Sequence, residues 1–239
     1  MNFFVYIIES PSNEDIENGR IEGKVLTEYF KLGGDIPYSY NFVTNRGQLA
    51  EALTSHLIQA CENFQGIPIL HFSMHGSKGG IHLTNDFISW HELRILLLPL
   101  LQELNIFLII CMSTCFGIHG CQMAMYLDNK PSFYALIGNN TKVSFKDAIM
   151  AYQSFYHRLF KGGTTFHDCV EAMKSASGNN NFDYVLGENI RQYIYLESIK
   201  RQALNVALQR MKNATLGMRN MAFMGDFANN SSYQQRLLR

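Results

Sequence analysis

The sequence lacks an excess of charge of either sign. Its 239 residues include 20 lysine and arginine residues and 20 aspartate and glutamate residues. A chain without a strong overall field has no global reason to bind nucleic acid or an acidic membrane. The charge is uneven along the chain, because the segment from Glu197 onward is basic and the preceding part is acidic. We therefore expect no direct contact with nucleic acid.

A secretion signal and a membrane-length apolar run are also missing. The segment 1–10 has no basic flank and only a short apolar stretch, which is typical of a buried strand. The most apolar segments, 95–101 and 106–111, are separated by polar residues and are shorter than a membrane span. Since 47% of the residues are hydrophobic, the chain can build a sizeable core. We expect a cytoplasmic globular protein without a membrane span.

The cysteines are too few, and odd in number, to indicate a disulfide framework. The five positions are Cys61, Cys111, Cys115, Cys121 and Cys169. In a chain without a secretion signal, such a set favours free thiols.

Apolar runs that alternate with helical patterns predict an α/β fold. Short strands are expected at residues 3–8, 38–43, 67–74, 106–111 and 133–137, a small hairpin at 79–90, and helices at 23–32, 48–61, 91–104, 145–159 and 165–175. The strands at 67–74 and 106–111 are almost wholly apolar, as are central strands of a parallel sheet that is covered on both faces. We predict a mostly parallel sheet with helices on both faces.

The character of the sequence changes after residue 180, so we predict two parts. Residues 1–180 carry the α/β pattern, and residues 181–239 form a C-terminal extension. In the extension, 184–196 fits a strand or a helix, and 197–211 has a strong helical pattern. The stretch 217–239 is rich in Met, Asn, Ser and Gln, which is typical of segments that are disordered or ordered by a partner. We expect a partly helical extension that serves an activating protein partner.

Two candidate catalytic residues follow the two most apolar strands. His75 comes directly after the strand at 67–74, and Cys115 lies in a loop after the strand at 106–111. Residues just past the carboxyl ends of neighbouring strands meet in one crevice of an open α/β sheet. A histidine can take the proton of a thiol and later deliver it to a leaving amine. Because Gly76 has no side chain, we expect its N–H and that of Cys115 to bind the developing oxyanion.

The segments around these residues resemble the caspase-haemoglobinase superfamily of cysteine proteases, in particular the bacterial caspase-like and CHAT-type peptidases. The resemblance covers residues 2–178 and is carried by the segments 71–76 (His-Phe-Ser-Met-His-Gly), 113–117 (Ser-Thr-Cys-Phe-Gly), 135–138 (Ala-Leu-Ile-Gly) and 161–163 (Lys-Gly-Gly). It implies a caspase-like fold, a dyad of His75 and Cys115, and cleavage of a specific protein substrate, often within bacterial defence. We expect no cofactor.

The resemblance also bears on the substrate pocket. Many relatives have an acidic residue two positions before the nucleophile, where this chain has Ser113. Ser113 and Asp147 are the candidate pocket residues.

Other interpretations of the same segment stay open. Cys111, Cys115, His119 and Cys121 bring four possible zinc ligands together, although without a Cys-x-x-Cys pair, and would suit a metal-stabilised regulatory protein. Cys111 also ends a strand and could be the nucleophile. A non-catalytic adaptor with the same fold is a further alternative, and a dyad does not exclude acyl transfer other than proteolysis. We favour a cysteine endopeptidase without a metal.

Overall fold

The structure, a computed structural model, describes residues 2–33, 36–104, 108–128 and 132–236. The chain divides into two compact units, of which the first ends at Gln192 and the second begins at Tyr193. No helix within these ranges is long and apolar enough to cross a membrane.

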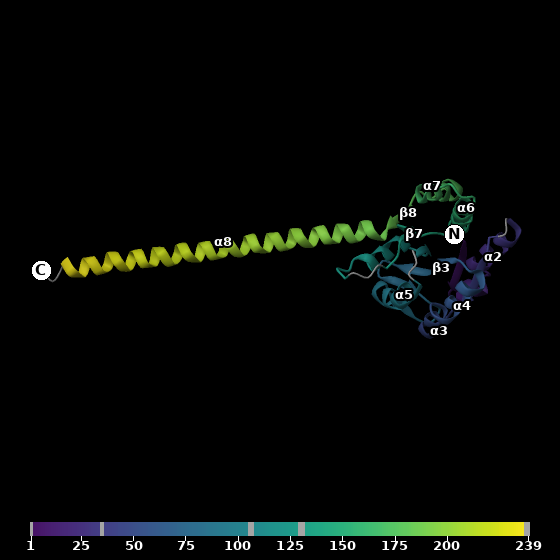
Figure 1. Cartoon of the computed structure of the whole chain (residues 1–239), viewed down its shortest axis with the longest axis horizontal. Coiled ribbons are helices and arrows are strands. Elements are labelled where there is room, and N and C mark those ends of the chain that lie inside the picture. The colour runs from purple at the N-terminus through teal and green to yellow at the C-terminus, as the bar shows by residue number, and fades with distance from the viewer. Residues whose placement is uncertain (1, 34–35, 105–107, 129–131, 237–239) are drawn as a thin grey trace. The chain divides into compact units, whose positions relative to one another are not determined.

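Six strands of the first unit form the main sheet, in the order β2–β1–β3–β6–β7–β8. They are β1 (Phe3–Ser10), β2 (Tyr38–Phe42), β3 (Ile67–Ser77), β6 (Ile109–Ser113), β7 (Ala135–Asn139) and β8 (Phe182–Leu186), labelled in part in Figure 1. All neighbouring strands run parallel except β7 and β8. The far end of β3 continues into a small antiparallel hairpin with β4 (Gly80–His82) and β5 (Phe87–Ser89). The predicted mostly parallel sheet is confirmed.

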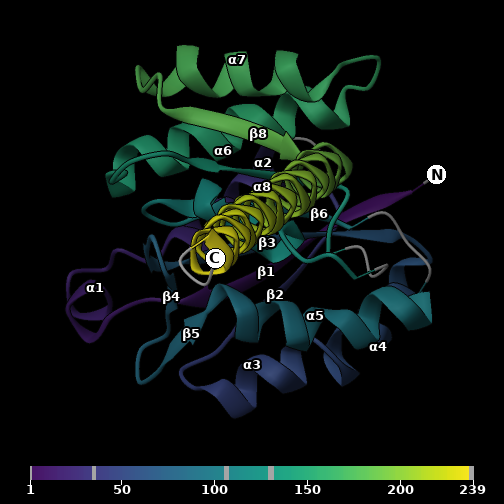
Figure 2. The same cartoon turned by 90° about the vertical axis from the view of Figure 1, so that its left-hand side faces the viewer.

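Helices cover both faces of this sheet (Figure 2). On one face lie α2 (Glu22–Gly33), α6 (Phe145–Phe160) and α7 (Phe166–Ser177), and on the other lie α3 (Arg46–Ala52), α4 (Ser55–Phe64) and α5 (Trp90–Leu104). Alternate residues of β1 enter the two cores: Ile7 joins the core that contains Phe155, and Tyr6 joins the core that contains Leu57. Because both faces are buried, the central strands are mostly apolar.

The single helix predicted at residues 48–61 is wrong, because the structure has two helices there. Helix α3 ends at Ala52 and α4 begins at Ser55. Thr54 lies between them with a non-helical backbone, and its hydroxyl donates to the carbonyl of Ala50 at 2.7 Å. A threonine side chain that bonds to the preceding turn competes with helix continuation. Of the strand predicted at 106–111, residues 106 and 107 lie outside the described residues.

The last strand belongs to the sheet, although the predicted boundary at residue 180 placed it in the extension. Strand β8 pairs with β7, with Phe182 opposite Asn139, and the Phe182 side chain is buried in the core. Helix α8 (Gly187–Arg236) follows directly. It is continuous from 217 to 236, where the composition is typical of segments that are disordered or ordered by a partner. Strand β8 has only five residues, so its alternation is too short to be distinguished from a first helical turn.

Candidate active site

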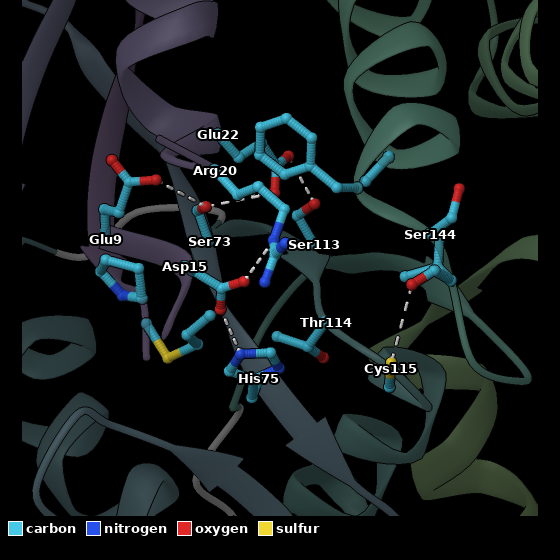
Figure 3. A pocket seen from close by; sticks show the side chains of 15 residues that line it. Glu9, Asp15, Arg20, Glu22, Ser73, His75, Ser113, Thr114, Cys115 and Ser144 are labelled. Atoms are coloured by element: carbon cyan, nitrogen blue, oxygen red, sulfur yellow. Dashed lines mark hydrogen bonds and ion pairs between the residues drawn. The ribbon is translucent and has the colours of Figure 1, made fainter. Parts of the chain in front are cut away.

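His75 and Cys115 follow equivalent positions of two adjacent strands. Strands β3 and β6 are parallel neighbours, and Ser73 pairs with Ser113. His75 and Cys115 each come two residues later, at the carboxyl edge of the sheet (Figure 3). The predicted dyad requires that these two strands are neighbours, and they are.

A pocket of about 270 Å³ opens at this edge. His75, Ser113 and Cys115 all line it, together with acidic side chains from β1 and the helices that follow. The pocket lies beside β1, which has β2 on one side and β3 on the other. A reversal of strand order of this kind is where open α/β sheets place their ligands.

Asp147, the other predicted pocket residue, does not line this pocket. It lies in the first turn of α6, where its backbone N–H donates to the hydroxyl of Ser144 at 3.1 Å. The residue thus takes part in capping a helix, and its role in a substrate pocket stays a prediction.

The loop that carries the thiol packs tightly against the end of β3. The Cys115 side chain is half-buried, and its Sγ donates to the carbonyl oxygen of Val143 at 3.8 Å. A Cβ atom on Gly76 would lie 2.5 Å from the Cys115 carbonyl oxygen and 2.8 Å from the Cβ of Thr114. Only glycine therefore fits at position 76. No hydrogen bond joins the side chains of His75 and Cys115 in the described structure.

The imidazole of His75 is bound by a carboxylate that sequence reasoning missed. Its Nε2 lies 2.6 Å from Oδ2 of Asp15, in the short helix α1 (Asn13–Glu17). The other oxygen, Oδ1, accepts a hydrogen bond from Nε of Arg20 at 2.7 Å. Burial alone would raise the pKa of Asp15, but hydrogen bonds from Ser12, Arg20 and His75 together hold that pKa well below its ordinary value. Asp15 is therefore an ionised partner of the histidine.

Two buried carboxyl groups form the floor of the pocket. Glu22, the first residue of α2, accepts hydrogen bonds from the hydroxyls of Ser113 at 2.6 Å and Ser73 at 3.1 Å. Glu9, at the end of β1, accepts from the same Ser73 hydroxyl at 3.2 Å and from the N–H of Gly23 at 2.6 Å. Figure 3 shows this chain of contacts from Glu9 through Ser73 and Glu22 to Ser113.

The ionisation of Glu9 is shifted by its surroundings. Burial raises its pKa above the ordinary value, an effect that the Gly23 N–H partly offsets and that nearby Glu22 reinforces. The Tyr40 hydroxyl also donates to Glu9 at 2.7 Å, and Nε2 of His71 lies 3.5 Å from Oε1 of Glu22. The pocket floor is therefore acidic.

The structure does not assemble the alternative sites around Cys111. Its side chain is fully buried in the core, and burial raises the pKa of its thiol to about 12, which is unfavourable for a nucleophile. Among the described residues, no three His, Cys, Asp or Glu side chains are grouped so that they could hold a metal ion. The cluster of four candidate zinc ligands in the sequence is therefore not a cluster in space.

Comparisons with known proteins bear on the fold. No protein-family model matches the sequence, and no curated protein matches it. A similar solved structure is that of a secreted C11 cysteine protease from Bacteroides thetaiotaomicron, in complex with an irreversible peptide inhibitor. The TM-score is 0.51 at 10% identity, over 78% of this chain and 66% of the protease chain.

This chain thus spans slightly less than two thirds of the protease that it resembles. At such low identity, the likeness establishes the fold and not the chemistry. Together with the sheet order and the flanking helices, it shows that the chain shares the α/β fold of that structure, a mostly parallel sheet with helices on both faces.

Proposed function

We propose that this chain is a cysteine endopeptidase with His75 and Cys115 as its catalytic dyad. The observation that supports the proposal is that the two residues occupy matched positions, each two residues after the paired Ser73 and Ser113 of neighbouring strands, at one shared pocket. The N–H groups of Gly76 and Cys115 are the proposed oxyanion donors. The fold of the similar cysteine protease agrees with this chemistry.

In the proposed reaction, His75 takes the proton from the Cys115 thiol and the thiolate adds to the scissile carbonyl carbon. The carbonyl oxygen becomes an oxyanion, which the two N–H groups bind. When the C–N bond breaks, the imidazolium gives its proton to the leaving amine. Water, deprotonated by His75, then hydrolyses the thioester and restores the thiol.

The pocket floor favours a cationic side chain on the residue before the cut. Glu9 and Glu22 are buried, and a carboxylate away from water is stabilised by a paired cation. Arg20 also lines the pocket, but it is already paired with Asp15 and Glu14. Ser113, which stands where relatives have an acidic residue, instead holds the Glu22 carboxylate from α2. We therefore propose cleavage after arginine or lysine.

The dyad is tested by intact-mass spectrometry after treatment with an irreversible, thiol-directed peptide probe that carries arginine. We expect one label per wild-type chain and none on the Cys115→Ala variant. The rate in His75→Ala should fall by about 10²-fold or more, because a general base contributes roughly 10²–10⁴-fold. Cys121→Ala, which removes another half-buried thiol, is the matched control and should react normally. Equal labelling of all four proteins would exclude an activated Cys115 and favour the adaptor.

We also propose that the C-terminal extension brings a protein partner to the peptidase. In the described part of α8, large apolar side chains are more than half exposed, among them Tyr193, Leu196, Leu204 and Met211. A helix with exposed apolar residues is suited to contact another protein.

Deletion of residues 197–239 tests this role of the extension. Because the first unit ends at Gln192, the shortened chain should retain probe labelling of Cys115. Its cleavage sites in a cell extract, mapped as new protein N-termini, should be fewer than those of the full chain and less specific to one substrate. Identical sets of sites would show that the extension has no part in substrate choice or regulation.

A further inference from the structure

The contact between His75 and Asp15 adds a residue to the proposed dyad. We infer that Asp15 is the positioning residue of the site, which fixes the His75 imidazole with its proton on Nε2 and leaves Nδ1 to exchange a proton with Cys115. The inference rests on the proposed function for its catalytic meaning, but the tautomer that it specifies does not depend on activity.

The short distance sets the direction of the hydrogen bond. Nε2 of His75 and Oδ2 of Asp15 are 2.6 Å apart, a separation typical of a charge-assisted bond. An ionised carboxylate has no proton to give, so Nε2 must be the donor. The depressed pKa of Asp15 supports that ionised state, in which burial is outweighed by hydrogen bonds from Ser12, Arg20 and His75. In the neutral imidazole, Nδ1 is then the free base.

Asp15 is held more firmly than the histidine that it binds. Its backbone N–H donates to the Ser12 hydroxyl at 3.1 Å, and its Oδ2 accepts from the Ser12 backbone N–H at 3.4 Å, which forms the capping box of α1. The Ser12 hydroxyl also donates to Oδ2 at 2.6 Å. Arg20 fixes the other oxygen. The Asp15 side chain is 15% exposed, whereas that of His75 is 54% exposed. In the described part of the chain, the His75 ring has one hydrogen bond, which is the one to Asp15. This bond therefore orients the imidazole.

This arrangement keeps the proton transfers in balance. The thiol proton moves to Nδ1, Nε2 keeps its own proton in the bond to Asp15, and the carboxylate stays ionised beside the imidazolium. When the amine leaves, the proton on Nδ1 departs with it. Asp15 thus stabilises the imidazolium and orients the ring without itself exchanging a proton, as carboxylates do in hydrolase triads.

Three variants of the full chain separate positioning from helix capping. Asp15→Ala should lower the rate of probe labelling by about 10- to 100-fold, since it removes part of the general-base contribution. Asp15→Asn keeps the size of the side chain but removes its charge, and its amide can donate to Nε2 and favour the opposite tautomer, so the rate should fall at least as far. Asp168 is a matched control, because it forms the same capping box with Thr165 at the start of α7 without contacting His75. Asp168→Asn should label at the wild-type rate.

The tautomer is measured directly by ¹⁵N NMR of histidine-labelled protein, in a Cys115→Ala background that cannot react. The His75 signals are assigned by their loss in His75→Ala, and neutral His75 should carry its proton on Nε2. Adding Asp15→Ala should abolish this preference. A proton on Nδ1, or unchanged labelling rates in both Asp15 variants of a reactive chain, would overturn the role of Asp15. If the wild-type chain fails to react with the probe, the peptidase proposal fails, and the tautomer still decides whether Asp15 fixes the imidazole.

Discussion

Replacing Gly76 with alanine should reduce labelling of Cys115 by the arginine probe about 10²-fold or more. The new Cβ would lie 2.5 Å from the Cys115 carbonyl oxygen and 2.8 Å from the Cβ of Thr114. Backbone atoms cannot rotate away as a flexible side chain does, so the nucleophile loop must shift. Displacement of a reacting group by about 1 Å can cost roughly 10²-fold in rate. The measurement is the second-order rate constant of labelling, together with thermal unfolding.

The stability of this variant should fall by about 1–3 kcal/mol, which is the usual cost of overpacking a well-packed site. Gly79→Ala is the control, because a Cβ there would have its nearest neighbour, the tip of the Phe87 ring, at an ordinary 3.7 Å. The control should retain both labelling and stability. Labelling of Gly76→Ala at the wild-type rate would mean that the contact between β3 and the nucleophile loop does not matter for reactivity.

Replacing Glu22 with glutamine should lower kcat/KM for a peptide with arginine before the cut by about 10²-fold. Loss of one partner of a buried, hydrogen-bonded charge pair costs about 2–5 kcal/mol, and each 1.4 kcal/mol corresponds to a tenfold change. Citrulline has the shape of arginine without its charge. The Glu22→Gln variant should therefore cleave a peptide with citrulline before the cut at least as fast as the wild type does. Glu171→Gln, which removes an exposed carboxylate that is paired with Lys174, is the control. Equal loss for both peptides would show that Glu22 supports the fold rather than selecting charge.

The same selection should depend on pH through Glu9. Burial raises the pKa of Glu9, while arginine stays protonated, so a bound guanidinium favours the ionised carboxylate. As the pH falls through this raised pKa, the pocket loses negative charge and KM for the arginine peptide should rise. KM for the citrulline peptide should not follow, and Glu9→Gln should remove the difference between the two profiles.

The positions of His75 and Cys115 could be predicted because strand order and apolar content are linked. A strand that is buried on both faces lies near the centre of a sheet, and residues 67–74 and 106–111 are the two most apolar of the predicted strands. Two central strands have a good chance of being neighbours, and β3 and β6 are. The residues that follow them then share one edge.

The acidic residues of the site were harder to predict, because nothing local marks them. Glu9 ends a strand and Glu22 begins a helix, both common places for a solvated carboxylate. They converge because β1 lies between β2 and β3, an order that residue patterns do not specify. The Ser-x-x-Asp pattern at Ser12 and Asp15 could have indicated a helix start, but not that the carboxylate also reaches His75.

The residues proposed to break the peptide bond and those proposed to select the substrate side chain come from different parts of the chain. The proposed base lies near the end of β3 and the proposed nucleophile follows β6. The acidic floor comes from β1 and from the first turn of α2, and both precede His75 by more than fifty residues. Ser113 links the two parts through its hydrogen bond to Glu22. A peptidase built in this way can acquire a new preference through one substitution at the start of α2, while the atoms that break the bond keep their positions.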